Sequence, residues 1–158
     1  MKRLQITLLF ALLHLVTWCP TVAECLTLRK IDFEAIRQER IISRLMYTFR
    51  IIESGDDYTK RGLSGEYGAY QFLPSTWTLY CLEFYGKELD IRVDENQDRV
   101  AYLKLKKLLD NGFTEDQIAS FWNSGRANGH HLVGVNKHGV PYNVKKYVDN
   151  FLSIYNNI

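Results

Sequence analysis

The segment DFEAIRQERIISRLMYTFRIIES, residues 32–54, contains the pattern that decides the fold. Its apolar residues recur with the three- and four-residue spacing of one helix face. These residues are Ile42, Leu45, Met46, Phe49 and Ile52. The Ser-Gly-Asp-Asp sequence of residues 54–57 is typical of a helix end. We therefore predict a long amphipathic helix over 32–54 that buries one face in a core.

Glu53 lies on the apolar face of this predicted helix. It follows Phe49 by four positions and Met46 by seven, so the three side chains point the same way. Apolar neighbours oppose a negative charge, and a helix C-terminus carries partial negative charge of its own. Both effects raise the pKa of a carboxyl group, as a general acid working near neutral pH requires. The alternative is a glutamate that reaches solvent at a frayed helix end.

The rest of the sequence is also mainly helical in pattern. We predict a second helix from about Pro74 to the residue before Gly86, and a third from Asp94 to about Asn111, where Gln97 completes a capping-box pattern. The second helix has Trp77, Tyr80, Cys81 and Phe84 on one face.

Two shorter elements and a last helix complete the pattern. Thr114 and Gln117 form a second capping-box pattern, which opens a short helix that ends at residues 123–125. Residues 124–141 indicate a loop or a small hairpin. The last helix has one apolar stripe, made of Val144, Tyr147, Val148, Phe151, Leu152 and Tyr155. The fold class is therefore predicted as all-α, or mainly α with a small hairpin, with a groove lined by the loops after Glu53 and Asn123.

The first 23 residues have the features of a cleaved export signal. Lys2 and Arg3 precede a short apolar run over 6–16, and small residues end the segment at Ala23. The run is shorter than the ~20 apolar residues that span a bilayer, so we expect no retained membrane anchor. Cleavage after Ala23 would leave 24–158 as one domain, large enough for a core, in the periplasm or cell-wall space or secreted.

The charge and the cysteine content further limit the functions and the kinds of site that the sequence supports. Removal of Lys2 and Arg3 from the 20 basic residues leaves 18, equal to the 18 acidic residues, which gives no support to nucleic-acid binding. Cys25 and Cys81 remain as an even pair in an oxidising compartment, either as a disulfide or as two buried free thiols. We expect no metal and no cofactor, and we interpret His130, His131 and His138 as exposed loop residues.

Three segments together resemble the catalytic domain of the soluble lytic transglycosylases, in the lysozyme-like superfamily. Glu53-Ser54-Gly55 is similar to the family's E-S-G, and GAYQFLPST over 68–76 is similar to its G-x-x-Q-x-x-P-x-T. FWNSG over 121–125 is a variant of A-Y-N-A-G. The likeness extends from about Ile36 to Tyr155 with the segments in family order.

This resemblance implies a lysozyme-like fold and an activity. The family cleaves the β-1,4 bond between N-acetylmuramic acid and N-acetylglucosamine in peptidoglycan. Glu53 would give its proton to the glycosidic oxygen, and its carboxylate would then remove a proton from the muramic C6 hydroxyl, which closes a 1,6-anhydro ring without water.

The resemblance also implies a set of substrate-binding residues: Ser54, Gly68, Gln71, Phe72, Asn123 and Tyr147. Gln71 and Asn123 offer amide groups to a sugar, and Gly68 permits a close backbone approach or a positive φ that shapes the groove. Ser54 orients Glu53 or a sugar, Phe72 stacks on a sugar face together with Tyr70 and Trp122, and the hydroxyl of Tyr147 reaches Glu53. The structural alternatives are helix termination for Ser54 and Asn123, loop packing for Gln71, and core packing for Trp122 and Tyr147.

Two other functions stay open. A hydrolytic lysozyme needs a second carboxylate, for which Asp57 and Glu66 are the candidates, although both are otherwise typical loop residues. The non-enzymatic alternative is a glycan-binding or assembly module of a secretion or conjugation apparatus. The expected partner is the peptidoglycan strand, with secretion, conjugation or phage machinery as a further one, and the expected state is a monomer.

Overall fold

The computed structural model describes the backbone of residues 22–158 and all side chains from Phe33 onward. Contacts within the chain divide it into two units, residues 1–39 and Arg40–Ile158. The site described below lies wholly in the second unit. Apart from Val22 and Ala23, the predicted export signal lies outside the described residues, so its cleavage stays a prediction.

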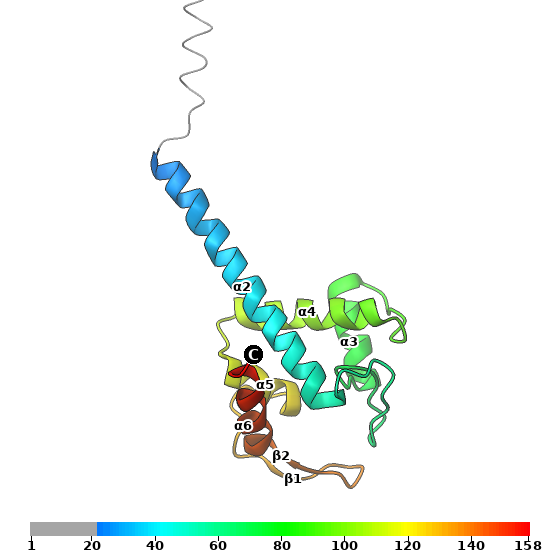
Figure 1. Cartoon of the computed structure of the whole chain (residues 1–158). Helices are drawn as coiled ribbons and strands as arrows, with labels where there is room; N and C mark the ends of the chain where they lie inside the picture. Colours follow the sequence, from blue (N-terminus) through cyan, green and yellow to red (C-terminus); the bar gives the residue numbers. More distant parts are fainter. Residues whose placement is uncertain (1–21) are drawn as a thin grey trace, which may run out of the picture. The chain divides into compact units, whose positions relative to one another are not determined.

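Five helices and one two-stranded hairpin make up residues 22–158 (Figure 1). The helices are α2 (Val22–Ser54), α3 (Pro74–Tyr85), α4 (Asp94–Asp110), α5 (Glu115–Ser124) and α6 (Val144–Tyr155). Strands β1 (Val133–Val135) and β2 (Pro141–Asn143) pair antiparallel, with Gly134 opposite Tyr142. The prediction of a mainly α fold with a small hairpin is confirmed. Helix α2 begins ten residues before its predicted start at Asp32, because residues 22–31 contain neither glycine nor proline, which would interrupt a helix.

The second half of α2 supplies the centre of the core. Ile42, Leu45 and Phe49 are fully buried. The ring of Phe49 stacks on Trp122 of α5 with 4.4 Å between centroids and lies 4.7 Å from the ring of Phe151 on α6. Helix α5 packs against α6, and α3 packs against α4. The end of α2, which carries Glu53, is therefore held between elements that are distant in sequence.

The helix ends show where local patterns hold and where they fail. The capping box of Thr114 and Gln117 is present at α5, where the backbone N–H of Thr114 donates to Oε1 of Gln117 at 3.0 Å. The capping box predicted for α4 is wrong. Its N-cap is Val93, and the fully buried side chain of Gln97 turns instead to the loop after α2. Tertiary hydrogen bonds have replaced the local one.

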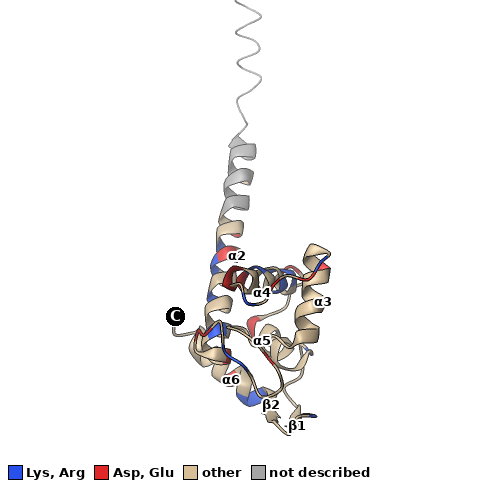
Figure 2. Cartoon of the chain, turned by 90° about the vertical axis from the view of Figure 1, so that its right-hand side faces the viewer, with Lys and Arg blue, Asp and Glu red and all other residues tan. Residues whose placement is uncertain are grey.

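Acidic and basic residues are interspersed on the helices of the second unit, as on α4 (Figure 2). Lys106 and Asp110, one turn apart on α4, form an ion pair at 3.1 Å. None of the helices within residues 22–158 combines the length and the apolar character that a membrane span needs.

Candidate active site

The loop after α2, residues 55–73, is held in place by the side chain of Gln97. Its Nε2 donates to the carbonyl oxygens of Tyr58 at 3.0 Å and Ile91 at 2.8 Å, and its Oε1 accepts from the N–H of Ala69 at 2.8 Å. A buried amide with all of these bonds satisfied fixes a loop firmly, since an unsatisfied buried polar group costs ~1–3 kcal/mol. This loop, which forms one side of the cavity described below, is thus attached to α4.

Gly68 is required where this loop passes Gln97. Its φ is +84°, and a Cβ atom at this position would lie 2.0 Å from Oε1 of Gln97. Both the positive φ and the close approach that the sequence suggested are therefore present. Gly68 shapes the loop and does not line the cavity described next.

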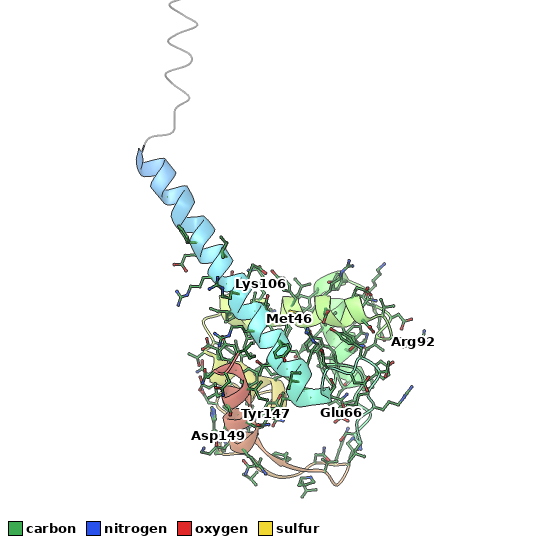
Figure 3. The ribbon with its side chains drawn as sticks, viewed as in Figure 1. Met46, Glu66, Arg92, Lys106, Tyr147 and Asp149 are labelled. Atoms are coloured by element: carbon green, nitrogen blue, oxygen red, sulfur yellow. The ribbon has the colours of Figure 1, made fainter. Side chains whose placement is uncertain are left out.

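Glu53 lies in the last turn of α2 and is half-buried. The hydroxyl of Tyr147, on α6, donates a hydrogen bond of 2.5 Å to Oε1 of Glu53. Figure 3 shows Tyr147 on α6 and Glu66 on the loop that follows α2, on either side of the end of α2. The structure therefore brings together Glu53 and Tyr147 as the resemblance implied.

The surroundings of Glu53 raise its pKa from 4.5 to about 7. Burial is the main cause, because it disfavours the charged carboxylate, and the negative charge of Glu66 acts in the same direction. The hydrogen bond from Tyr147 and the ammonium of Lys60 oppose this shift. Lys60 also donates through Nζ to the backbone carbonyl of Glu53 at 3.1 Å. Near neutral pH the carboxyl can therefore exist in both its protonated and its charged form.

Glu53 opens onto a cavity of about 320 Å³. Its polar lining includes Glu66 and Gln71 from the loop and Asn123 from the end of α5, and Trp122 adds an aromatic surface. The rest of the lining comes from the loop and the hairpin: Gly62, Leu63, Ser64, Leu73 and Val140. One carboxyl with a raised pKa thus faces a space with amide, carboxyl and aromatic groups around it.

A second cavity, of about 1060 Å³, is lined by residues of the hairpin and of α6. It is lined by Tyr147 and shares Asn123 with the first cavity. Its other lining residues come from the hairpin and α6: Val133, Gly134, Pro141, Tyr142, Asn143, Lys146, Asp149 and Asn150. The two cavities therefore share Asn123, and Glu53 lines the first of them only.

Gln71 and Asn123, which the resemblance implies as substrate-binding residues, both line the first cavity. The backbone of Gln71 has a φ of +49°, and its Nε2 donates to the carbonyl oxygens of Gly68 at 2.8 Å and Lys60 at 3.2 Å. None of the described residues donates a hydrogen bond to its Oε1, which leaves that atom as an acceptor for a ligand. Asn123 is exposed and lines both cavities.

Ser54 and Phe72 do not reach either cavity. Oγ of Ser54 donates to the carbonyl of Arg50 at 3.0 Å and accepts from the N–H of Asp57 at 3.0 Å, so it completes the helix end. The ring of Phe72 is only 3% exposed and packs among Trp77, Tyr80 and Trp122. The predicted substrate contacts of both residues are therefore wrong: Ser54 is a helix-terminating residue and Phe72 a core residue.

Tyr70 is also a core residue rather than a stacking surface. It is fully buried, and its hydroxyl donates to Asp98 at 2.7 Å. Of the three aromatic residues considered for stacking, Trp122 alone lines the cavity that Glu53 faces.

The two candidate second carboxylates differ in position. Glu66 lines the cavity with Glu53 and accepts a hydrogen bond from the N–H of Ser64 at 2.8 Å. Asp57 is exposed, and its Oδ1 accepts bonds from the N–H and the hydroxyl of Thr59, both at 2.8 Å. Asp57 is thus a turn residue outside both cavities, and Glu66 is the one candidate of the two that stays near Glu53.

The histidine and cysteine predictions concern residues away from these cavities. His131 and His138 are exposed, and His130 is half-exposed with its Nε2 3.9 Å from Asp116. In the part of the chain that the structure describes, no group of three His, Cys, Asp or Glu residues could hold a metal ion. Cys81 is a buried free thiol. The predicted disulfide between Cys81 and Cys25 is therefore not formed in this structure, and the side chain of Cys25 lies outside the described side chains.

Sequence reasoning missed Gln97 as the residue that organises the loop, and Tyr142 as part of the second cavity. Gln97 lies in the first turn of α4, where its spacing from Asp94 was interpreted as a capping box and gave no sign of a contact with the loop. Tyr142 directly follows the loop or hairpin predicted over residues 124–141, so it could have been noticed as a neighbour of the predicted groove.

Comparison of the chain with family models, with curated proteins and with solved structures finds no match in any of the three.

Proposed function

We propose that this protein is a peptidoglycan lytic transglycosylase in which Glu53 acts first as the acid and then as the base. The observation that carries the proposal is the carboxyl of Glu53, which has a pKa of about 7, accepts a hydrogen bond from Tyr147 and faces a cavity. A carboxyl with that pKa can both give and take a proton near neutral pH. The sequence segments that resemble the soluble lytic transglycosylases contribute this glutamate, Gln71 and Asn123.

The proposed reaction returns Glu53 to its starting state. Protonated Glu53 donates its proton to the glycosidic oxygen as the bond between that oxygen and the muramic C1 breaks. The resulting carboxylate takes the proton of the muramic C6 hydroxyl, whose oxygen then bonds to C1. The products are a free N-acetylglucosamine end and a 1,6-anhydro ring, and no water is consumed.

Tyr147 would assist the first step. Burial raises the pKa of Tyr147 well above its ordinary value, so its hydroxyl stays a donor. It donates to Oε1 of Glu53, which leaves Oε2 to exchange the proton with the substrate. The same bond stabilises the carboxylate that forms when the proton has left, since hydrogen bonds to a charged group are about twice as strong as neutral ones.

Gln71 and Asn123 would position the sugar. Oε1 of Gln71 is available to accept from an acetamido N–H, and the exposed amide of Asn123 lies where the two cavities meet. A substrate with an acetamido group on every ring offers hydrogen-bond partners to the two amide side chains that line the cavity with Glu53. Because peptidoglycan lies outside the cytoplasmic membrane, the proposal includes export to the periplasm or cell-wall space.

The second candidate function is a hydrolytic lysozyme with Glu66 as the second carboxylate. It is favoured by one observation, that Glu66 lines the same cavity as Glu53. In that reaction Glu66 would act on water or on the sugar, and the product would carry a reducing end. Glu66 has the alternative task of ordering the loop through its bond to the N–H of Ser64.

Mass spectrometry of the fragments released from purified peptidoglycan separates the two functions. The lytic reaction gives anhydro-muramic products that are lighter by one water than the hydrolytic ones. A Glu66→Gln variant is the matched test. We expect the variant and the original protein to give the same anhydro products, whereas reducing-end products that disappear in Glu66→Gln would identify a lysozyme.

A further inference from the structure

The turn of the hairpin touches the loop after α2 through one side-chain hydrogen bond. Nδ2 of Asn136 donates to Oγ of Ser64 at 3.2 Å, although the two residues are 72 apart in sequence. Figure 1 shows the hairpin turn and this loop extending to the same end of the second unit. This contact is used neither by the proposed chemistry nor by the packing of the core.

Both partners belong to ordered turns. Oδ1 of Asn136 accepts from the N–H groups of His138 at 2.9 Å and Val140 at 3.0 Å, so the side chain closes the hairpin turn. On the other side, the N–H of Ser64 donates to Glu66 at 2.8 Å. The bond therefore joins two preformed turns, and its formation costs little extra ordering of the chain.

The contact closes a circuit of chain that includes Glu53 and other residues that line its cavity. Residues 53–64 run from the acid to Ser64, and residues 136–147 run from Asn136 through β2 to Tyr147. The Glu53–Tyr147 bond joins these segments at one end, and the Ser64–Asn136 bond joins them at the other. The cavity is lined by both segments, by Ser64 from the first and by Val140 from the second.

We propose that the Ser64–Asn136 contact bridges the cavity that Glu53 faces and makes the enzyme prefer the ends of glycan strands. This inference rests on the proposed function. A strand that meets Glu53 in the cavity lies between the two joined segments, so an end can be threaded through the closed circuit. The middle of a long strand can enter only when the Ser64–Asn136 contact opens. Ser64 and Asn136 are then specificity-determining residues that touch no reacting atom.

Ser64→Ala is the variant that tests the bridge, because it removes the acceptor hydroxyl and leaves the turn of Asn136 intact. Long glycan strands without peptide cross-links are digested, and products are separated by length during the first few per cent of the reaction. We expect the original protein to release mainly disaccharides while the remaining strands stay long. In Ser64→Ala the ratio of intermediate-length fragments to disaccharides is expected to rise about fivefold, which corresponds to the loss of a hydrogen bond of ~1 kcal/mol.

Two control variants make the result specific. Ser64→Thr keeps a hydroxyl and is expected to retain the original product pattern. Lys137→Ala changes an exposed residue of the same hairpin turn and is expected to have no effect on fragment length. A rise in intermediate fragments in Lys137→Ala equal to that in Ser64→Ala would contradict the bridge.

The remaining outcomes distinguish this inference from the function on which it rests. Intermediate-length fragments from the original protein at the start of the reaction, or an unchanged pattern in Ser64→Ala, would overturn the bridge while leaving the lytic activity standing. If the original protein releases no fragment of any length, the proposed function fails and the inference fails with it.

Discussion

The hydroxyl of Tyr147 on α6 donates a 2.5 Å hydrogen bond to Oε1 of Glu53 at the end of α2. The bond acts against the effect of burial on Glu53, because it favours the carboxylate whereas burial favours the neutral acid. The negative charge of Glu66 acts on the side of burial. The pKa of Glu53 is therefore set in part by one neighbour from α6 and one from the loop after α2. Substitution of either neighbour tests its effect on the protonation of Glu53.

Tyr147→Phe removes the hydrogen bond and keeps the ring. The pKa of Glu53 is expected to rise, so the loss of activity on the alkaline side moves to higher pH. Turnover at the optimum is expected to fall by roughly 10- to 100-fold, the equivalent of a hydrogen bond of ~1.5–3 kcal/mol to a charged group. The measurement is kcat against pH with soluble glycan strands, and an unchanged alkaline limb would show that the bond does not control the acid.

Glu66→Gln removes the neighbouring negative charge and keeps the size of the side chain. The pKa of Glu53 is expected to fall, because Glu66 helps to raise it. The alkaline limb of the kcat profile therefore moves to lower pH, opposite to its movement in Tyr147→Phe. The two variants therefore serve as controls for each other. If the alkaline limb moved in the same direction in Glu66→Gln and in Tyr147→Phe, these assigned effects on the pKa of Glu53 would be contradicted.

Glu53 also makes the stability of the protein depend on pH. Its pKa is higher in the folded state, so its favourable contribution is complete below 4.5, is lost progressively up to about 7, and stays lost above that. Glu53→Gln is neutral at every pH. We expect it to be more stable than the original protein by about 2 kcal/mol at pH 8, which allows for the exposed part of the side chain. At pH 4 and below, the two proteins are expected to unfold at the same urea concentration.

Two glycines of the loop separate backbone strain from a clash. Gly65 and Gly68 both have a positive φ, but an added Cβ meets no atom within 4 Å at Gly65 and meets Gln97 at Gly68. Gly65→Ala is expected to cost roughly 1–2 kcal/mol of unfolding free energy from backbone strain. Gly68→Ala is expected to cost about 3 kcal/mol or more, since the clash with a buried side chain is added. Equal midpoints in urea would show that the approach of Gln97 is unimportant.

The helical elements could be predicted from the sequence because each has a local apolar period and a local stop signal. The apolar face of α2 with Glu53 on it and the capping box at α5 depend on residues within a few turns of one another. Gln97 illustrates the limit of such patterns. Its spacing from Asp94 matched a capping box, but the side chain is buried and binds a loop that is close in space and distant in sequence.

The candidate site was predictable in part. The proximity of Glu53 and Tyr147 was expected from the resemblance alone, because no local pattern places residues 94 apart in contact. Phe72 was assigned to the substrate from its place in a motif, whereas its burial depends on rings from α3 and α5. The contact between Ser64 and Asn136 had no sequence signal, since both are ordinary turn residues.

The most direct test of the central claim is the release of soluble fragments from purified sacculi by Glu53→Gln beside the original protein. Glutamine keeps the size of the side chain and an acceptor for Tyr147 but can neither donate the carboxyl proton nor take one back. We expect no measurable release from Glu53→Gln, together with binding to sacculi close to that of the original protein. Release at the original rate would show that Glu53 is not the acid, and binding without release by both proteins would show that the chain is a wall-binding module rather than an enzyme.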